Sequence, residues 1–106
     1  MSIPTVTVED LKKLRDDRQP HVLVDVRQPD EYETCRIEGA VLIPLPELPN
    51  RLSELPKDKT LIVHCHHGGR SARAVGFLNQ QGYQAKNLEG GIDAWSERVD
   101  PSVERY

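Results

Sequence analysis

Short apolar runs alternate along the chain with segments whose apolar residues recur at helical spacing. Residues 22–26, 40–43 and 60–64 are almost continuously apolar and of strand length. Such a run is typical of a strand covered on both faces, as in a parallel sheet. A short β-branched run at 5–8 and a short run at 84–88 predict two further strands.

Helix signals fall between these runs. Thr7 and Asp10 have the spacing of a capping box, and Leu11 and Leu14 mark one face of a helix that ends near residues 18–20. Further helices are predicted from Pro29, as one broken helix over 44–56, over 71–81 and over 92–99. Gly82 is predicted as the left-handed cap of the helix over 71–81.

Strands that alternate with helices at this spacing predict a three-layer α/β domain. We expect a mostly parallel five-stranded sheet flanked by helices, formed by one domain over residues 1–106. The length agrees, because 106 residues suffice for one core and leave little room for a second. A folded chain of this length is expected to expose roughly 6,000 Å².

Composition and charge exclude several classes of function. Fourteen basic and 17 acidic residues give a net charge of -3, which disfavours nucleic-acid binding. No apolar run is long enough for a membrane helix, and residues 1–4 lack the charged and apolar blocks of a signal peptide. We expect a cytoplasmic monomer that binds neither nucleic acid nor membrane.

The two cysteines, Cys35 and Cys65, are too few for a disulfide framework. Cys35 follows the helix predicted from Pro29. It is either a small apolar filler at the end of that helix or a resolving thiol for Cys65, and we favour the filler.

Cys65 directly follows a predicted buried strand, where ligands bind in parallel α/β sheets. The loop at 64–71 reads H-C-H-H-G-G-R-S. A free cysteine has a pKa of about 8.5, so only roughly 3% is thiolate at pH 7. The alternative to a reactive thiol is a buried, inert cysteine at the end of a strand.

Three features of the loop favour the thiolate. The helix predicted from Ser71 points its positive end at the loop. Gly68 and Gly69 can adopt backbone angles that turn successive N–H groups inward as an anion nest. Arg70 adds a permanent positive charge.

Four segments together carry a specific pattern. They read L-V-D-V-R at 23–27 with E-Y at 31–32, G-A-V-L-I-P at 39–44, C-H-H-G-G-R at 65–70 and L-E-G-G-I-D-A-W at 88–95. In this order they resemble the rhodanese family of sulfurtransferases, whose motifs are D-V-R-x-x-x-E-[FY], G-A-x-x-I-P, C-x-x-G-x-R and L-x-G-G-x-x-x-W. The chain departs from the family at 35–40, where C-R-I-E-G-A replaces the usual G-H-I-P-G-A.

The resemblance implies that Cys65 is catalytic and carries sulfur as a persulfide. The donor would be a small anion such as thiosulfate, and the acceptor cyanide in vitro or a thiol or partner protein in the cell. It further implies substrate binding by the residues that follow the cysteine, namely His66, His67, Gly68, Gly69, Arg70 and Ser71. Arg70 would orient the anionic donor, and no metal or organic cofactor is needed.

Other residues in and near the loop have alternative roles. The resemblance makes Asp25 and Arg27 structural, with pairing to groups such as Glu31. The two adjacent histidines, His66 and His67, either bind anions when protonated or serve only through their backbone. A zinc site at 64–67 is disfavoured, because adjacent residues cannot all converge on one ion.

The sequence also allows two alternative functions. Cdc25-type phosphatases and arsenate reductases carry H-C-x-x-x-x-x-R, but here four residues, one too few, separate Cys65 from Arg70. The narrower loop favours a single sulfur over a tetrahedral oxyanion. The other rival is a non-enzymatic docking or persulfide-relay module, in which the tail at 100–106 could contact a partner. We favour an ordinary frayed end as the explanation of that tail.

Overall fold

The structure, a computed structural model, describes residues 3–106 and contains one five-stranded sheet in the order β1-β5-β4-β2-β3. The strands are β1 (Thr5–Val6), β2 (Val22–Asp25), β3 (Val41–Leu42), β4 (Thr60–His64) and β5 (Gln84–Leu88). Every pair of neighbouring strands is parallel. The predicted sheet is therefore confirmed.

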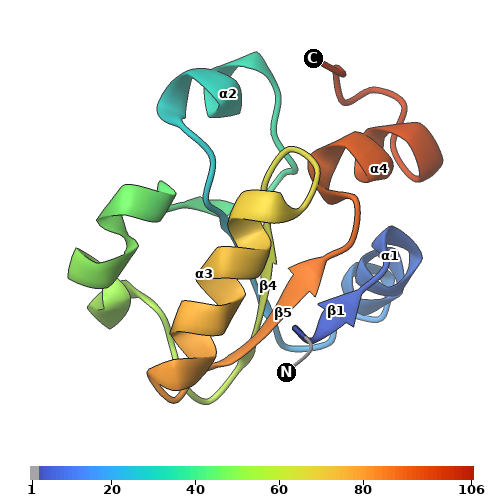
Figure 1. The fold of residues 1–106 in the computed structure, drawn as a ribbon. Coiled ribbons are helices and arrows are strands. Elements are labelled where there is room, and N and C mark those ends of the chain that lie inside the picture. The colour runs from blue at the N-terminus through green and yellow to red at the C-terminus, as the bar shows by residue number, and fades with distance from the viewer. Residues whose placement is uncertain (1–2) are drawn as a thin grey trace.

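Helices cover both faces of the sheet, which confirms the three-layer prediction (Figure 1). They are α1 (Val8–Asp16), α2 (Pro29–Thr34), α3 (Gly69–Gln80) and α4 (Gly91–Arg98), with 3₁₀ helices η1 (Leu45–Asn50) and η2 (Leu52–Glu54). One apolar core lies under α3, η1 and η2, and a second lies under α1 and α4.

The start of α1 follows the sequence signal. The Asp10 N–H donates to the Thr7 hydroxyl at 3.1 Å, and the Thr7 N–H donates to the Asp10 carboxylate at 3.0 Å. This reciprocal pair is the predicted capping box. The helix ends at Asp16, two residues before the predicted end at Arg18.

Two predicted helices differ from the observed ones. The broken helix over 44–56 is a pair of short 3₁₀ helices, because Pro49 inside η1 has no N–H to continue an α-helical ladder. Helix α3 begins at Gly69, two residues before Ser71, because Gly68 serves as its N-cap. Its far end is as predicted, with Gly82 at φ +91° directly after the capping residue.

The carboxyl ends of the parallel strands place distant segments at one edge of the sheet. Strands β2 and β4 end at Asp25 and His64, which are paired in register, and Val63 of β4 pairs with Asn87 of β5. The loop after His64 therefore lies beside the segments that follow β2 and β5. The molecule exposes 5945 Å². Within residues 3–106, no helix is long and apolar enough to cross a membrane.

Candidate active site

Cys65 lies between β4 and α3, and its side chain is almost completely enclosed, with 2% exposed. Its Sγ accepts from the Gly68 N–H at 3.1 Å and from the Ser71 N–H at 3.4 Å, and the Ser71 hydroxyl oxygen also lies 3.4 Å from it. Ser71 is the third residue of α3, where a helix N–H ordinarily bonds to the side chain of the capping residue. The Gly68 cap has no side chain, so the Cys65 sulfur takes that place.

The contacts of Cys65 determine its acidity. Burial by itself raises the pKa of the thiol, because it disfavours the charged form. Hydrogen bonds from the Ser71 hydroxyl and from the N–H groups of Ser71, Gly68 and Arg70 act in the opposite direction and outweigh it. The pKa of Cys65 is therefore lowered, and the thiolate is more abundant at neutral pH than in a free cysteine.

The two loop glycines have different roles. Gly68 has φ +117°, a backbone conformation that aims its N–H at the sulfur and that other residues rarely adopt. Gly69 is the first residue of α3 and does not have a positive φ. The prediction that both glycines use angles closed to other residues is therefore wrong for Gly69.

Asn87 on β5 also belongs to this site, although the sequence did not predict it. Its Oδ1 lies 2.5 Å from the Ser71 hydroxyl, and its Nδ2 donates to the Gly68 carbonyl at 3.1 Å. Its side chain thus holds both residues that bind the Cys65 sulfur. A polar residue at the end of a predicted buried strand was the available signal.

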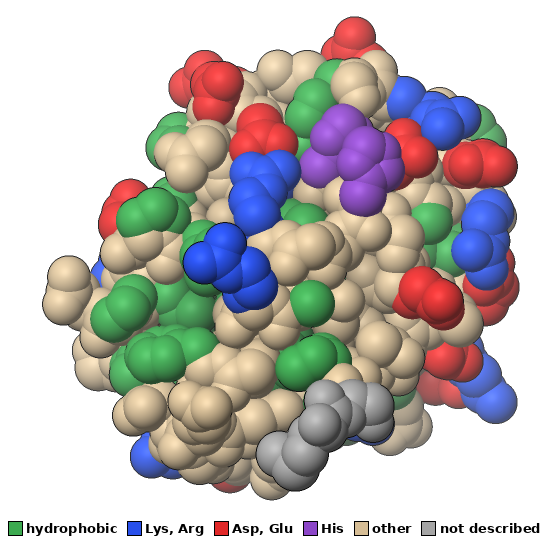
Figure 2. All heavy atoms as spheres, in the orientation of Figure 1, with side chains coloured by type: hydrophobic (Ala, Val, Ile, Leu, Met, Phe, Trp, Pro, Cys, Tyr) green, Lys and Arg blue, Asp and Glu red, His purple; other side chains and the backbone are tan. Residues whose placement is uncertain are grey.

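Arg70 is paired with a carboxylate. Both of its terminal nitrogens donate to Glu31 of α2, at 2.6 and 2.9 Å. This bidentate contact is the main reason that the pKa of Glu31 falls to about 2. The positive charge of Arg70 is therefore paired with a carboxylate and is not free. On this face of the molecule, basic and acidic side chains adjoin the histidines (Figure 2).

The two loop histidines lie beside the C-terminal residue. The His66 ring stacks on His67 and on Tyr106, with ring centroids 3.9 Å apart in both cases. Partial burial lowers the pKa of His66, which disfavours its protonated form. This opposes anion binding by a charged His66.

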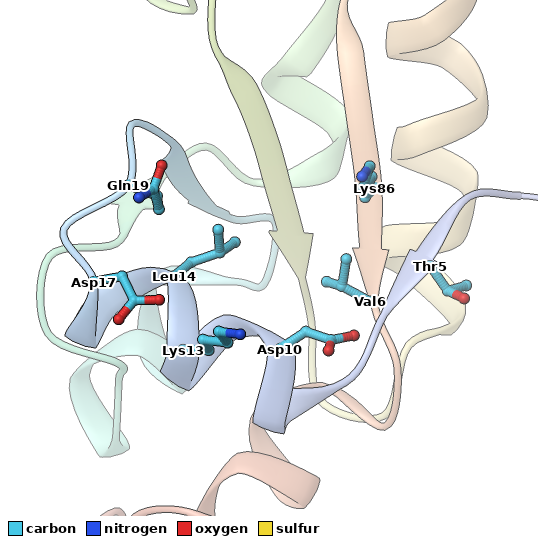
Figure 3. A pocket seen from close by; sticks show the side chains of 8 residues that line it. All are labelled: Thr5, Val6, Asp10, Lys13, Leu14, Asp17, Gln19 and Lys86. Carbon is cyan, nitrogen blue, oxygen red and sulfur yellow. The ribbon is translucent and has the colours of Figure 1, made fainter.

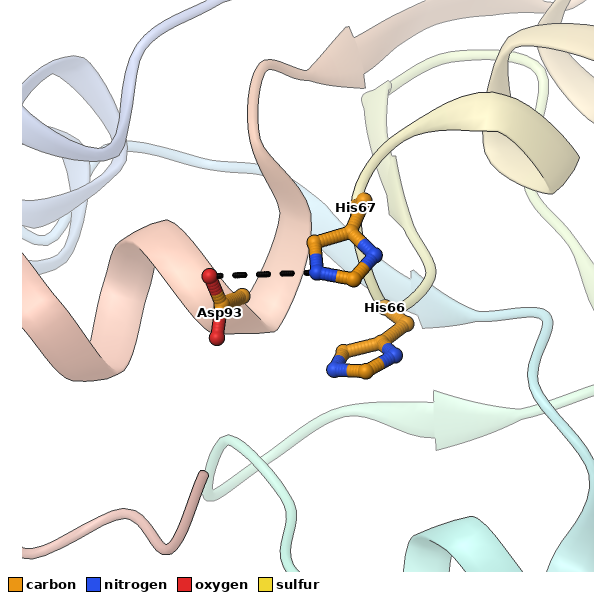
Figure 4. A group of neighbouring side chains, drawn as sticks. All are labelled: His66, His67 and Asp93. Carbon is orange, nitrogen blue, oxygen red and sulfur yellow. Dashed lines mark ion pairs between the residues drawn. The ribbon is translucent and has the colours of Figure 1, made fainter. Parts of the chain in front are cut away.

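His66, His67 and Asp93 are close enough to suggest a metal site (Figure 4), since one ligand atom from each lies within 4.8 Å of the others. The stacked rings are only 27° from parallel, and imidazole lone pairs lie in the ring planes, so the two nitrogens do not aim at one point. Arg105 already binds both carboxylate oxygens of Asp93. The geometry fits stacking and ion pairing better than metal ligation.

Asp25 ends β2, Arg27 follows it two residues later, and both are fully buried. Their closest contact is 2.7 Å, and Arg27 also donates to the Cys35 carbonyl and to the Tyr106 hydroxyl. The predicted pairing with Glu31 takes a different form, because Arg27 reaches the Glu31 carbonyl at 3.4 Å and not its carboxylate.

Cys35 and Cys65 belong to different cores. Cys35 packs in the core under α1 and α4, whereas Cys65 packs in the core under α3. Both are free thiols. This placement favours Cys35 as a filler.

A surface pocket of about 500 Å³ lies elsewhere, between α1 and the β1–β5 edge of the sheet (Figure 3). Its lining is Thr5, Val6, Asp10, Lys13, Leu14, Asp17, Gln19 and Lys86. The loop at 64–71 does not contribute to it, so the pocket is separate from Cys65.

Comparison with known proteins agrees with the fold and identifies the family. A sulfurtransferase of Allochromatium vinosum is 40% identical over 96 residues, 90% of each chain. The probable adenylyltransferase/sulfurtransferase MoeZ of Mycobacterium tuberculosis is 36% identical over 105 residues, which are 96% of this chain but 27% of MoeZ.

Solved structures give the same result. A rhodanese-like domain protein of Staphylococcus aureus superposes with a TM-score of 0.86 at 33% identity, over 98% of this chain and 99% of that one. A thiosulfate sulfurtransferase of Pseudomonas aeruginosa has a TM-score of 0.86 at 30% identity, over 97% of this chain and 20% of that one. The sequence model of the rhodanese-like domain matches residues 7–98. The chain therefore belongs to the rhodanese-like domain family, and its relatives include named sulfurtransferases.

Proposed function

We propose that this chain transfers sulfur through a persulfide on Cys65, from a small anionic donor such as thiosulfate to a thiophilic acceptor. The observation that carries the proposal is the enclosed Cys65 sulfur with N–H and O–H donors from Gly68 and Ser71. These donors favour the thiolate, which is the nucleophilic form.

The reaction needs no external oxidant or reductant. The Cys65 thiolate attacks the outer sulfur of thiosulfate, a new S–S bond forms, and sulfite leaves with the electron pair of the broken bond. An acceptor nucleophile then attacks the outer sulfur of the persulfide, and the Cys65 thiolate departs. Cyanide would give thiocyanate, and a thiol acceptor would become a persulfide.

The acceptor in the cell is proposed to be a thiol or a partner protein. MoeZ, named for both adenylyltransferase and sulfurtransferase functions, carries a segment like this chain within a longer protein. Such an arrangement supports transfer from Cys65 to a protein. The donors at the start of α3 would hold the anionic persulfide, so the proposal requires no cofactor.

The first test is the intact mass of the protein after incubation with thiosulfate, before and after cyanide. We expect a gain of one sulfur on Cys65 and its removal by cyanide as thiocyanate. The Cys65→Ser variant should gain none, whereas Cys35→Ser should load like the parent chain. Loading that survives in Cys65→Ser would assign the nucleophile to Cys35. An aryl phosphate assay on the same samples tests the phosphatase alternative.

Arg70 is proposed to orient the anionic donor while it remains paired with Glu31. We expect Arg70→Ala to slow loading from thiosulfate about tenfold, which corresponds to one charge-assisted hydrogen bond. Loading rates from single-turnover mass measurements would show this, with Arg98→Ala on the exposed face of α4 as the control. Equal rates in both variants would remove Arg70 from the donor site.

A further inference from the structure

The hydroxyl of Ser71 lies between two hydrogen-bond acceptors. Its oxygen is 3.4 Å from the Cys65 sulfur and 2.5 Å from the Asn87 Oδ1. All three side chains are buried, and Asn87 is only 7% exposed. Because a hydroxyl carries one hydrogen, it can serve only one of these acceptors at a time.

The orientation of the Asn87 amide decides which acceptor is served first. The Nδ2 group faces the Gly68 carbonyl at 3.1 Å, and a carbonyl oxygen can only accept. The amide oxygen must therefore face Ser71, and since it too can only accept, Ser71 is the donor. In this arrangement the Ser71 oxygen presents lone pairs to the sulfur.

The two protonation states of Cys65 respond differently. A neutral thiol can donate its own hydrogen to the Ser71 oxygen, so both hydrogen bonds are formed. After the thiol proton has left to solvent, the thiolate and the Ser71 lone pairs face each other without a hydrogen. The hydroxyl must then rotate toward the sulfur, and its bond to Asn87 is lost.

We propose that Asn87 is a positioning residue that sets the nucleophilicity of Cys65 by competing with its sulfur for the Ser71 hydroxyl hydrogen. The N–H groups of Gly68 and Ser71 bind the sulfur in either state, so only the hydroxyl is exchanged. Asn87 thereby disfavours the thiolate form of Cys65 without contacting the sulfur itself.

The ionisable groups around the loop are held by other partners. Arg70 on α3 is bound to Glu31 on α2, and His64 at the end of β4 lies 3.8 Å from Asp25 at the end of β2. In the loop itself, the His66 ring is stacked between two aromatic rings. Asn87 makes its side-chain hydrogen bonds to Ser71 and Gly68, so its replacement leaves these ionisable groups in place.

A consequence follows for sulfur transfer, and it rests on the proposed function. Loading moves the negative charge from the Cys65 sulfur to the outer sulfur of the persulfide. The Ser71 hydrogen can then return to Asn87. Asn87 thus favours the loaded state over the free thiolate.

The test is the rate of alkylation of Cys65 by iodoacetamide as a function of pH, followed by peptide mass. Removal of the competing acceptor in Asn87→Ala should lower the apparent pKa by about half to one unit, raising the rate near pH 6 by about three- to tenfold. Ser71→Ala should raise the apparent pKa. In the Ser71→Ala background, Asn87→Ala should no longer lower it.

Asn79→Ala is the matched control, because the side-chain amide of Asn79 also joins α3 to β5, donating one hydrogen bond to the Ala85 carbonyl and accepting one from the Ala85 N–H. It should leave the pKa of Cys65 unchanged. Asn87→Leu, close in shape, replaces Asn87→Ala if the smaller side chain impairs folding, and the same shift is expected. A raised or unchanged pKa, or an equal shift with and without the Ser71 hydroxyl, overturns the proposal. Because alkylation needs no sulfur donor, this result is independent of whether the chain loads sulfur.

Discussion

At the scale of single residues, the acidity of Cys65 is determined by hydrogen bonds from the Ser71 hydroxyl and from backbone N–H groups of its own loop. Its sulfur closes the first turn of α3 in place of a capping side chain, and Gly68 supplies the turn that brings the N–H groups to it. The permanent charge of Arg70 is shared with Glu31 and contributes less than its sequence position suggests. Reactivity in this loop therefore depends on a conformation more than on a net charge.

Replacement of the two loop glycines by alanine should have opposite effects on stability. Gly68→Ala should lower the free energy of unfolding by about 1–2 kcal/mol, because an L-residue is strained at its positive φ. Gly69→Ala should raise it by about 0.5 kcal/mol, because a side chain there meets nothing within 4 Å and reduces the freedom of the unfolded chain. Urea denaturation of the two variants measures both changes. Equal effects would show that the conformation of Gly68 is not the source.

The sequence predicts the site residues that lie close together along the chain, but not the partners that are distant in sequence. Cys65, Gly68 and Ser71 lie within one short loop, whose position after a buried strand pointed to them. Asn87 is 16 residues from Ser71, and Glu31 is 39 residues from Arg70. Such pairs depend on strand order, which local periodicity does not specify.

At the scale of elements, α2 is a short helix attached to the rest of the fold by polar contacts. It has no buried residue, and its third position, Glu31, closes the capping box by accepting from the Gln28 N–H. The same carboxylate binds Arg70 on α3 and accepts from the Tyr106 hydroxyl. Glu31 therefore connects α2 to the loop at 64–71 and to Tyr106.

The acid sensitivity of the fold should report this connection. The pKa of Glu31 in the folded chain is about 2, chiefly because of Arg70, and lies below the unfolded value of about 4.3. Its stabilisation is thus complete above about pH 5 and is lost as the pH falls toward 2. Glu31→Gln should be less stable at pH 7 and lose less stability between pH 5 and pH 2, by urea denaturation at each pH. Parallel curves for the two proteins would contradict this.

Helix boundaries show where local signals are sufficient. The capping box of Thr7 and Asp10 fixed the start of α1, because both partners lie within one turn. The start of α3 was misplaced by two residues, because its cap is a glycine and its capping acceptor is a sulfur three residues earlier in the chain. Between Pro44 and Pro56 the leucine spacing indicated a helix, but the prolines limit it to 3₁₀ turns.

At the scale of the whole molecule, Arg27 joins parts of the chain that are far apart in sequence. From the end of β2 it binds Asp25, the Cys35 carbonyl after α2, and the hydroxyl of Tyr106. Neither side chain of the Asp25–Arg27 pair is exposed. This pair anchors the segments that surround the loop at 64–71.

Disruption of the buried pair should therefore affect the entire fold. Asp25→Asn leaves the Arg27 charge in the interior without its carboxylate, and we expect the free energy of unfolding at pH 7 to fall by about 3–5 kcal/mol. Glu9→Gln removes an exposed partner of Arg98 and should change it little. Thermal and urea denaturation give both values. A small effect of Asp25→Asn would show that the pair is not an anchor.

The separation of Cys35 from Cys65 has a consequence for oxidative damage. Peroxide converts a reactive thiolate to a sulfenic acid, which is protected from further oxidation when a second thiol condenses with it. The chain has two cysteines, and the sheet lies between the cores that contain them. Rescue of an oxidised Cys65 must then come from a thiol outside this domain. Toward oxidants the domain behaves as a one-cysteine protein, and its recovery depends on the reducing capacity of its surroundings.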